Sequence, residues 1–203
     1  EVVAATRGSG TELIVDAKRG DIGSTMAGYA DAYLGAGSPL AGDAVTLSPY
    51  LGAASLAPAV EAAAATERGV FVLCLTSNPE GAGVQHASSP DGVAVAAAVA
   101  RWAAEQNAAS GQVLGPVGLV VGATVGEAPA RLGIDLAAVR GPLLAPGVGA
   151  QGAGAAELRA VFGDARRAVL ASTSRAVLQA GPDLAALRRP ADDAVIEASS
   201  ALR

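Results

Sequence analysis

The residues best suited to chemistry lie in segment 16–25, directly after an apolar run, where Asp16, Lys18 and Asp21 are close neighbours. Asp16 and Lys18 are two positions apart, and such residues on an extended chain point to the same side, so both can contact one ligand. Asp21 follows Gly20, so its carboxylate can turn back towards Lys18 or outwards towards a neighbouring subunit. Flanking opposite charges favour the protonated form of Lys18, which makes it a candidate proton donor. A solvated salt-bridge network at the strand end explains the same spacing equally well.

A glycine-rich segment and a late arginine form a second candidate site, for a phosphate. Residues 147–152, Gly-Val-Gly-Ala-Gln-Gly, match the pattern G-x-G-x-x-G, but a dinucleotide fingerprint belongs to the first strand–helix turn, and this segment follows the fifth expected strand. Late loops of a barrel often hold phosphate through backbone N–H groups; Gln151 adds donors, and Arg175 can bind the same dianion in bidentate fashion. Tight-turn geometry and a surface ion pair are the plain alternatives. Polar groups in segment 76–79 suit a base or carbonyl, or a simple turn.

The composition of the chain excludes several classes of protein. With 203 residues, 51% of them hydrophobic and 3% aromatic, we expect one domain with a core of Ala, Val and Leu. A net charge of -5 argues against a nucleic-acid partner. The single cysteine, Cys74, lies in an apolar stretch, which indicates a reduced, buried thiol and a cytoplasmic protein. His86 has no Cys or acidic partners at ligand spacing, so no metal site is expected, and Arg101 interrupts the Ala-rich stretch before it could span a membrane.

Six β-rich runs alternate with Ala-rich segments of helical spacing, which predicts an α/β fold with a parallel sheet covered by helices. The predicted strands are 12–16, 44–48, 70–75, 117–121, 142–145 and 168–171; the predicted helices are 26–34, 56–66, 93–107, 125–132, 153–162 and 174–180, with a terminal helix after Pro190. A doubly wound sheet and a (β/α)8 barrel both place functional groups at the carboxyl ends of strands. Because a complete barrel needs about 250 residues, we expect residues 1–203 to be a single, incomplete (β/α)8 TIM barrel domain, its C-terminal three quarters.

Five motifs in the same order resemble those of the orotidine 5'-phosphate decarboxylase family, in its longer bacterial subgroup, from about Glu12 to Leu187. The most specific is DxKxxDI, formed by Asp16, Lys18, Asp21 and Ile22 and followed by Gly23-Ser24-Thr25. The others are Ser48-Pro49-Tyr50-Leu51-Gly52, Thr76-Ser77-Asn78-Pro79, Ala145-Pro146-Gly147-Val148-Gly149-Ala150-Gln151-Gly152 and Ser174-Arg175.

The resemblance implies a (β/α)8 barrel that forms a homodimer at the barrel mouths and converts orotidine 5'-phosphate to uridine 5'-phosphate in pyrimidine biosynthesis, without metal or organic cofactor. It implies that Asp16 faces the substrate carboxylate, Lys18 protonates C6 of the carbanion, and Asp21 reaches the partner's site to order Lys18 and a ribose hydroxyl. It further implies a substrate-binding set in which Thr25 assists at the ribose, Ser77 contacts the pyrimidine, and Gln151 and Arg175 hold the phosphate beneath a closing loop: Ile22, Thr25, Ser77, Pro146, Gly147, Gly149, Gln151, Ser174 and Arg175.

The chain departs from the family pattern in one respect. The family takes a ribose aspartate from its first barrel strand and a lysine from its second, and neither strand is in this sequence, so we expect a fragment of a longer enzyme. Two alternatives stay open. One is a catalytically inactive fragment that binds phosphate or nucleotide, or an oligomer partner whose Asp21 completes another site. The other is a related magnesium-dependent sugar-phosphate lyase with the same DxKxxD segment.

Overall fold

The computed structural model describes residues 1–148 and 153–203. Its described residues form one six-stranded sheet in which the order of the strands across the sheet is their order in the chain. The paired strands β1–β2, β2–β3 and β5–β6 are parallel, and helical segments connect successive strands, so the predicted α/β class is confirmed. The strands are β1 (Ile14–Arg19), β2 (Ala44–Leu47), β3 (Gly69–Leu75), β4 (Val117–Val121), β5 (Leu143–Pro146) and β6 (Val169–Ser172).

The strands form where apolar side chains can be buried on both faces of the sheet. Every residue of β2 and of β4 is buried, as expected for the apolar strands of a parallel sheet. The connecting α-helices are α1 (Val2–Thr6), α2 (Gly23–Leu34), α3 (Ala57–Ala65), α4 (Ala82–Gln85), α5 (Val95–Ser110), α6 (Ala128–Arg131), α7 (Ala155–Phe162), α8 (Arg175–Leu178) and α9 (Leu184–Leu202). Short 3₁₀ turns are η1 (Ala53–Leu56), η2 (Pro79–Gly81) and η3 (Gly163–Ala168).

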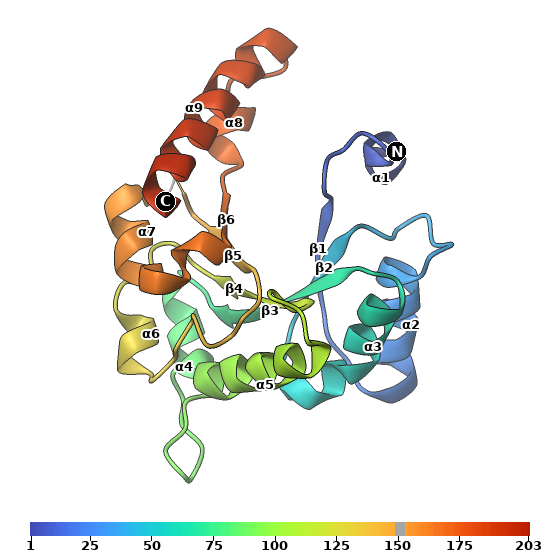
Figure 1. The fold of residues 1–203 in the computed structure, drawn as a ribbon, viewed down its shortest axis with the longest axis vertical. Helices are drawn as coiled ribbons and strands as arrows, with labels where there is room; N and C mark the ends of the chain where they lie inside the picture. The colour runs from blue at the N-terminus through green and yellow to red at the C-terminus, as the bar shows by residue number, and fades with distance from the viewer. Residues whose placement is uncertain (149–152) are drawn as a thin grey trace. The chain divides into compact units, whose positions relative to one another are not determined.

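The chain divides into two compact units. Unit 1 comprises Glu1–Leu73, Val99–Leu119 and Val139–Pro142; in it α2 and α3 lie side by side (Figure 1). Unit 2 comprises Cys74–Ala98, Val120–Ala138 and Leu143–Arg203; in it α7 lies against α9 (Figure 1). The prediction of a single domain stays a prediction.

A buried asparagine secures the start of β4 in unit 1. Asn107 is 1% exposed, and its side-chain amide donates to the carbonyl oxygens of Val117 and Val139, both at 2.8 Å. Its Oδ1 accepts from the Val117 N–H at 3.0 Å. Because a buried amide needs partners, these bonds fix β4 against the segment that leads to β5.

Several predicted boundaries were wrong, as three elements show. The first strand ends at Arg19 and not at residue 16. The last helix starts at Leu184, because Asp183 caps it by accepting from the Ala186 N–H at 2.9 Å, and Pro190 lies inside it. The helix predicted over 125–132 is confined to α6, since glycines with positive φ flank it on both sides.

The single cysteine is buried, as predicted. Cys74 is 2% exposed, and its thiol donates to the carbonyl oxygen of Ala96 at 3.4 Å. Burial raises the pKa of the Cys74 thiol to about 12. Within the described ranges, no helix is long and apolar enough to cross a membrane.

Candidate functional site

The structure brings Asp16 and Lys18 together on β1 in unit 1. Lys18 Nζ donates to both carboxylate oxygens of Asp16 at 2.6 Å, which is a short, charge-assisted contact. The Lys18 side chain is 50% exposed and that of Asp16 is 63% exposed, so the pair can still meet a ligand. Lys18 is also the only lysine of the chain, so it supplies the only side-chain ammonium group.

The backbone that presents this pair is a bulge and not a regular strand. In the pairing of β1 with β2, Val15 lies opposite Val45 and Arg19 lies opposite Leu47. The three residues from Asp16 to Lys18 therefore face the single residue Thr46. Lys18 adopts φ +46°, a left-handed conformation that residues with a β-carbon seldom take. The two side chains meet, but the regular strand alternation from which the prediction placed them on one side is not what produces the contact.

Thr46 on β2 joins both members of the pair, and the sequence analysis missed it. Its side chain is 1% exposed. Its hydroxyl accepts from the backbone N–H of Lys18 at 3.0 Å and donates to Asp16 Oδ1 at 2.8 Å. The signal available beforehand was a hydroxyl residue within an otherwise apolar strand, Ala-Val-Thr-Leu, next to the strand that carries the charged motif.

The surroundings of Asp16 set its charge. Partial burial acts to raise the pKa of Asp16, but hydrogen bonds from Lys18 and Thr46, together with the Lys18 charge, outweigh it and lower the pKa below its usual value. Asp16 is therefore ionised at neutral pH, and its carboxylate accepts both hydrogen bonds from Lys18 Nζ.

Asp21 does not turn back towards Lys18. Its Oδ1 accepts from the N–H of Ile22 at 2.8 Å at the start of α2, and within residues 1–148 and 153–203 it forms no salt bridge with Lys18. Ile22 is 62% exposed, and Thr25 in the first turn of α2 is exposed as well. The alternative prediction, that Asp21 serves a neighbouring subunit, stays open.

Ser77 lies in unit 2, in the loop that follows β3. Its side chain is exposed, and in the described part of the chain its hydroxyl has no hydrogen-bond partner. The residues on either side of Ser77 are fixed by hydrogen bonds. Thr76 accepts from Gln85 Nε2 at 2.7 Å and donates to Asn78 Oδ1 at 2.7 Å, and the Thr76 N–H donates to Gln85 Oε1 at 2.9 Å. An exposed donor on a fixed loop is suited to binding a ligand.

The predicted phosphate-binding residues also belong to unit 2. Pro146 ends β5 opposite Ser172 of β6, so the loops that follow these two strands start next to each other. Gly147 has φ +102°, as a tight turn requires. Ser174 and Arg175, at the start of α8, are both exposed. The predicted residues Gly149 and Gln151 lie outside the described residues.

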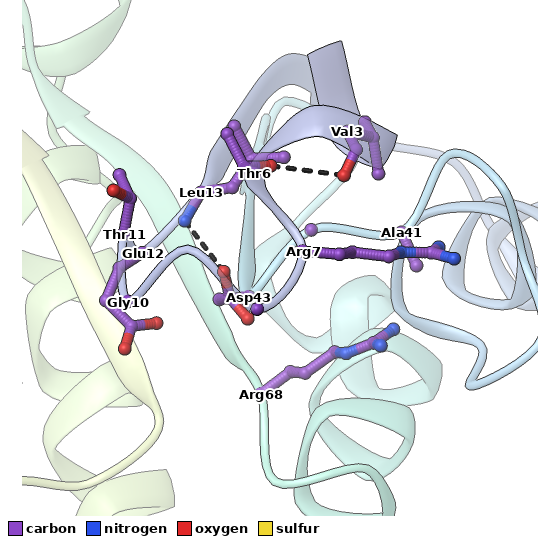
Figure 2. Close-up of a pocket in the computed structure, with 12 residues that line it drawn as sticks. Val3, Thr6, Arg7, Gly10, Thr11, Glu12, Leu13, Ala41, Asp43 and Arg68 are labelled. Atoms are coloured by element: carbon purple, nitrogen blue, oxygen red, sulfur yellow. Dashed lines mark hydrogen bonds between the residues drawn. The ribbon is translucent and has the colours of Figure 1, made fainter. Parts of the chain in front are cut away.

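A polar cavity of about 280 Å³ lies at the opposite end of the strands in unit 1 (Figure 2). It is lined by residues that precede β1, β2 and β3, including Leu13, Asp43 and Arg68. Several of its polar groups already bond within the chain: Asp43 Oδ2 accepts from the Leu13 N–H at 2.7 Å, and Arg68 donates to the carbonyl oxygen of Leu34 at 2.7 Å. We therefore assign no catalytic role to this cavity. Across the described ranges, no cluster of three or more His, Cys, Asp or Glu residues is suited to hold a metal ion.

Comparison with known proteins identifies close relatives. The model of the orotidine 5'-phosphate decarboxylase / HUMPS family matches residues 1–189. An orotidine 5'-phosphate decarboxylase from Salinispora arenicola is 59% identical over 194 residues, which cover 96% of this chain and 68% of the relative.

Solved structures agree with this match. A crystal structure from Streptomyces avermitilis, of a protein named as a candidate orotidine 5'-phosphate decarboxylase, has a TM-score of 0.91 and 52% identity over 98% of this chain and 68% of that chain. The orotidine monophosphate decarboxylase of Leishmania donovani has a TM-score of 0.71 and 32% identity over 98% of this chain and 72% of that chain.

Proposed function

The chain belongs to the orotidine 5'-phosphate decarboxylase / HUMPS family, and we propose that it decarboxylates orotidine 5'-phosphate to uridine 5'-phosphate in pyrimidine biosynthesis. Family membership confirms the resemblance deduced from the motifs. The sequential strand order and the similarity to the solved relatives confirm the fold class, an α/β fold with six strands of the (β/α)8 barrel type. Three relatives that are more than 50% identical to this chain are named orotidine 5'-phosphate decarboxylase, which supports the proposed reaction.

The observation that carries the proposal is the Asp16–Lys18 pair. In the proposed reaction the bond between C6 and the carboxylate breaks, carbon dioxide leaves, and the electron pair stays on C6. Lys18 then transfers one proton from Nζ to C6 and regains it from solvent. A fixed ammonium group stabilises the negative charge that develops on C6, and this interaction is strongest where water is excluded. Asp16, ionised at neutral pH, holds Lys18 Nζ in place until the transfer through the 2.6 Å contacts between the two side chains.

Substrate binding is proposed for the remaining family positions. Ser77 offers its free hydroxyl to the pyrimidine, and Arg175 offers a guanidinium fork to the phosphate, where Gln151 adds amide donors. Asp21 and Thr25 serve the ribose, with Asp21 acting in the partner subunit of a homodimer. Supporting contacts are assigned to Ile22, Pro146, Gly147, Gly149 and Ser174. We place the protein in the cytoplasm and propose that it needs neither metal nor organic cofactor.

The experiment that tests the function compares three proteins: the unaltered chain, Lys18→Ala and Arg131→Ala. Each is incubated with orotidine 5'-phosphate while uridine 5'-phosphate and carbon dioxide are measured, and each is titrated with uridine 5'-phosphate. We expect turnover by the unaltered chain to resist a chelator, and Lys18→Ala to lose turnover while its affinity for the nucleotide stays within about threefold. Arg131→Ala, which removes one exposed positive charge from α6, should match the unaltered chain.

Two other outcomes have clear meanings. Nucleotide binding without turnover by the unaltered chain would point to a catalytically inactive binding module. Loss of turnover with chelator would point to a related magnesium-dependent sugar-phosphate lyase. Full activity of Lys18→Ala would remove Lys18 from the proton-transfer step.

A further inference from the structure

We propose that Thr46 is a positioning residue that holds the Asp16 carboxylate and the Lys18 backbone in the geometry from which Lys18 delivers its proton. The inference rests on the proposed decarboxylase function, and it assigns a role to a residue outside the charged motif. Thr46 would not touch the substrate; it would act through its two neighbours on β1.

The first argument is the register of the two strands. Three residues of β1, from Asp16 to Lys18, lie opposite Thr46 alone, so the regular ladder of backbone hydrogen bonds is interrupted at this point. The Lys18 N–H is satisfied by the Thr46 hydroxyl at 3.0 Å, a side-chain acceptor in place of a backbone carbonyl. The hydroxyl therefore stabilises the bulge itself.

The second argument is the use of the hydroxyl in both directions. A threonine hydroxyl has one proton to donate, and Thr46 directs it to Asp16 Oδ1 at 2.8 Å while it accepts from Lys18. One buried group thus fixes the position of the carboxylate and the backbone from which the ammonium group extends. Because Thr46 is only 1% exposed, water has little access to the hydroxyl and cannot readily replace either hydrogen bond.

The third argument is the backbone strain at Lys18. A left-handed conformation with φ +46° at a lysine is unfavourable and persists only where surrounding contacts impose it. Without the Thr46 hydroxyl the Lys18 N–H would lose its partner, and the bulge could relax towards a regular strand. A regular strand would place the Lys18 backbone, and with it Nζ, in a different position. A displacement of about 1 Å of a catalytic group can lower the rate roughly a hundredfold.

The test uses three variants. Thr46→Val keeps the branched shape of the side chain and removes the hydroxyl, Thr46→Ser keeps the hydroxyl, and Thr66→Val removes a threonine hydroxyl elsewhere in unit 1, where it donates to the Ala62 carbonyl at 2.8 Å. We expect Thr46→Val to lower kcat about ten- to a hundredfold with KM within about threefold. Thr46→Ser should recover kcat to within about threefold of the unaltered chain, and Thr66→Val should leave kcat unchanged.

A second measurement needs no variant. In the unaltered chain, hydrogen exchange followed by NMR should show the Lys18 amide protected, since its partner is a buried hydroxyl. Rapid exchange of that amide would overturn the inference even if Thr46→Val failed to fold. Unchanged kcat in a folded Thr46→Val protein would overturn it as well. Absence of turnover in the unaltered chain would instead refute the proposed function, and the amide measurement would still decide the position of Thr46.

Discussion

At the scale of single residues, the proposed chemistry rests on one ion pair. Lys18 is the only lysine, and its ammonium group lies 2.6 Å from both oxygens of Asp16. Since both side chains are at least half exposed, water screens the pair, and such pairs contribute at most about 1 kcal/mol to stability. The pair therefore adds little to the stability of the fold.

The lowered pKa of Asp16 gives a first prediction. A carboxyl group whose pKa is lower in the folded than in the unfolded state stabilises the fold above its unfolded pKa, and that contribution is lost as the pH falls through the folded pKa. We therefore expect the Asp16–Lys18 contact to be intact at neutral pH and to open only in acid, below the usual titration range of aspartate. The measurement is an NMR pH titration of the Asp16 carboxyl carbon and of the Lys18 side chain, whose signals are unique because the chain has no other lysine.

A matched variant shows whether Thr46 contributes to this shift. Thr46→Val removes one of the hydrogen bonds that lower the pKa of Asp16, so the midpoint of the Asp16 titration should rise. Thr66→Val, which lies away from the pair, should leave it in place. An Asp16 midpoint at the ordinary aspartate value in the unaltered chain would contradict the geometry described for the pair.

At the scale of elements, the loop after β3 requires a glycine at position 81. A β-carbon at Gly81 would lie 2.7 Å from Thr76 Oγ1 and 3.0 Å from Gln85 Nε2, inside the hydrogen-bonded group that fixes the loop of Ser77. Gly83, two positions later, has no atom within 4 Å of the corresponding point. The two glycines therefore offer a matched pair of sites.

The second prediction follows from this difference. Gly81→Ala should break the Thr76–Gln85 bonds, lower the free energy of unfolding by about 1–3 kcal/mol and weaken uridine 5'-phosphate binding through Ser77. Gly83→Ala should be neutral or slightly stabilising, by up to about 1 kcal/mol, because alanine is the better helix former. Denaturant unfolding and nucleotide titration of both variants provide the measurement. Equal behaviour of the two variants would show that the hydrogen-bonded group does not position Ser77.

Local patterns predicted the elements because burial on both faces leaves a continuous apolar run, as in β4 (Val117–Val121), whose predicted and observed bounds coincide. Two-residue spacing predicted that Asp16 and Lys18 point to one side, and the two side chains do meet. The bulge and the role of Thr46 could not be predicted in this way, because they depend on which residue of β2 lies opposite β1. That register is a property of two strands far apart in the sequence.

At the scale of the whole molecule, each of the two units carries some of the family motifs. Asp16, Lys18 and Asp21 belong to unit 1, whereas Ser77 and Arg175 belong to unit 2. The chain spans 68% of the length of its Salinispora arenicola relative. In the proposed homodimer, Asp21 serves the site of the other subunit. Among the described residues, Asp21 bonds to the N–H of Ile22 and not to Lys18 of its own chain, which is compatible with that role.

The third prediction tests this division between subunits. If Asp21 acts in the partner's site, Lys18→Ala and Asp21→Ala are each inactive alone, but a mixed dimer contains one site with both groups intact. A statistical mixture after subunit exchange should then regain about a quarter of the activity of the unaltered dimer, because half of the dimers are mixed and each of these has one working site out of two. Sedimentation velocity establishes that dimers are present and exchange.

The control mixes Lys18→Ala with Asp16→Ala. Asp16 and Lys18 bond within one chain at 2.6 Å, so every site in such a mixed dimer lacks one member of the pair and no activity should return. Recovery with Asp21→Ala but not with Asp16→Ala would establish that Asp21 serves the other subunit. Mixed dimers without recovery would place Asp21 in its own chain's site, and a chain that sediments only as a monomer would refute the dimeric arrangement. The two mixtures thus contrast the carboxylate of Asp16, which bonds Lys18 directly, with that of Asp21, which bonds the Ile22 N–H instead.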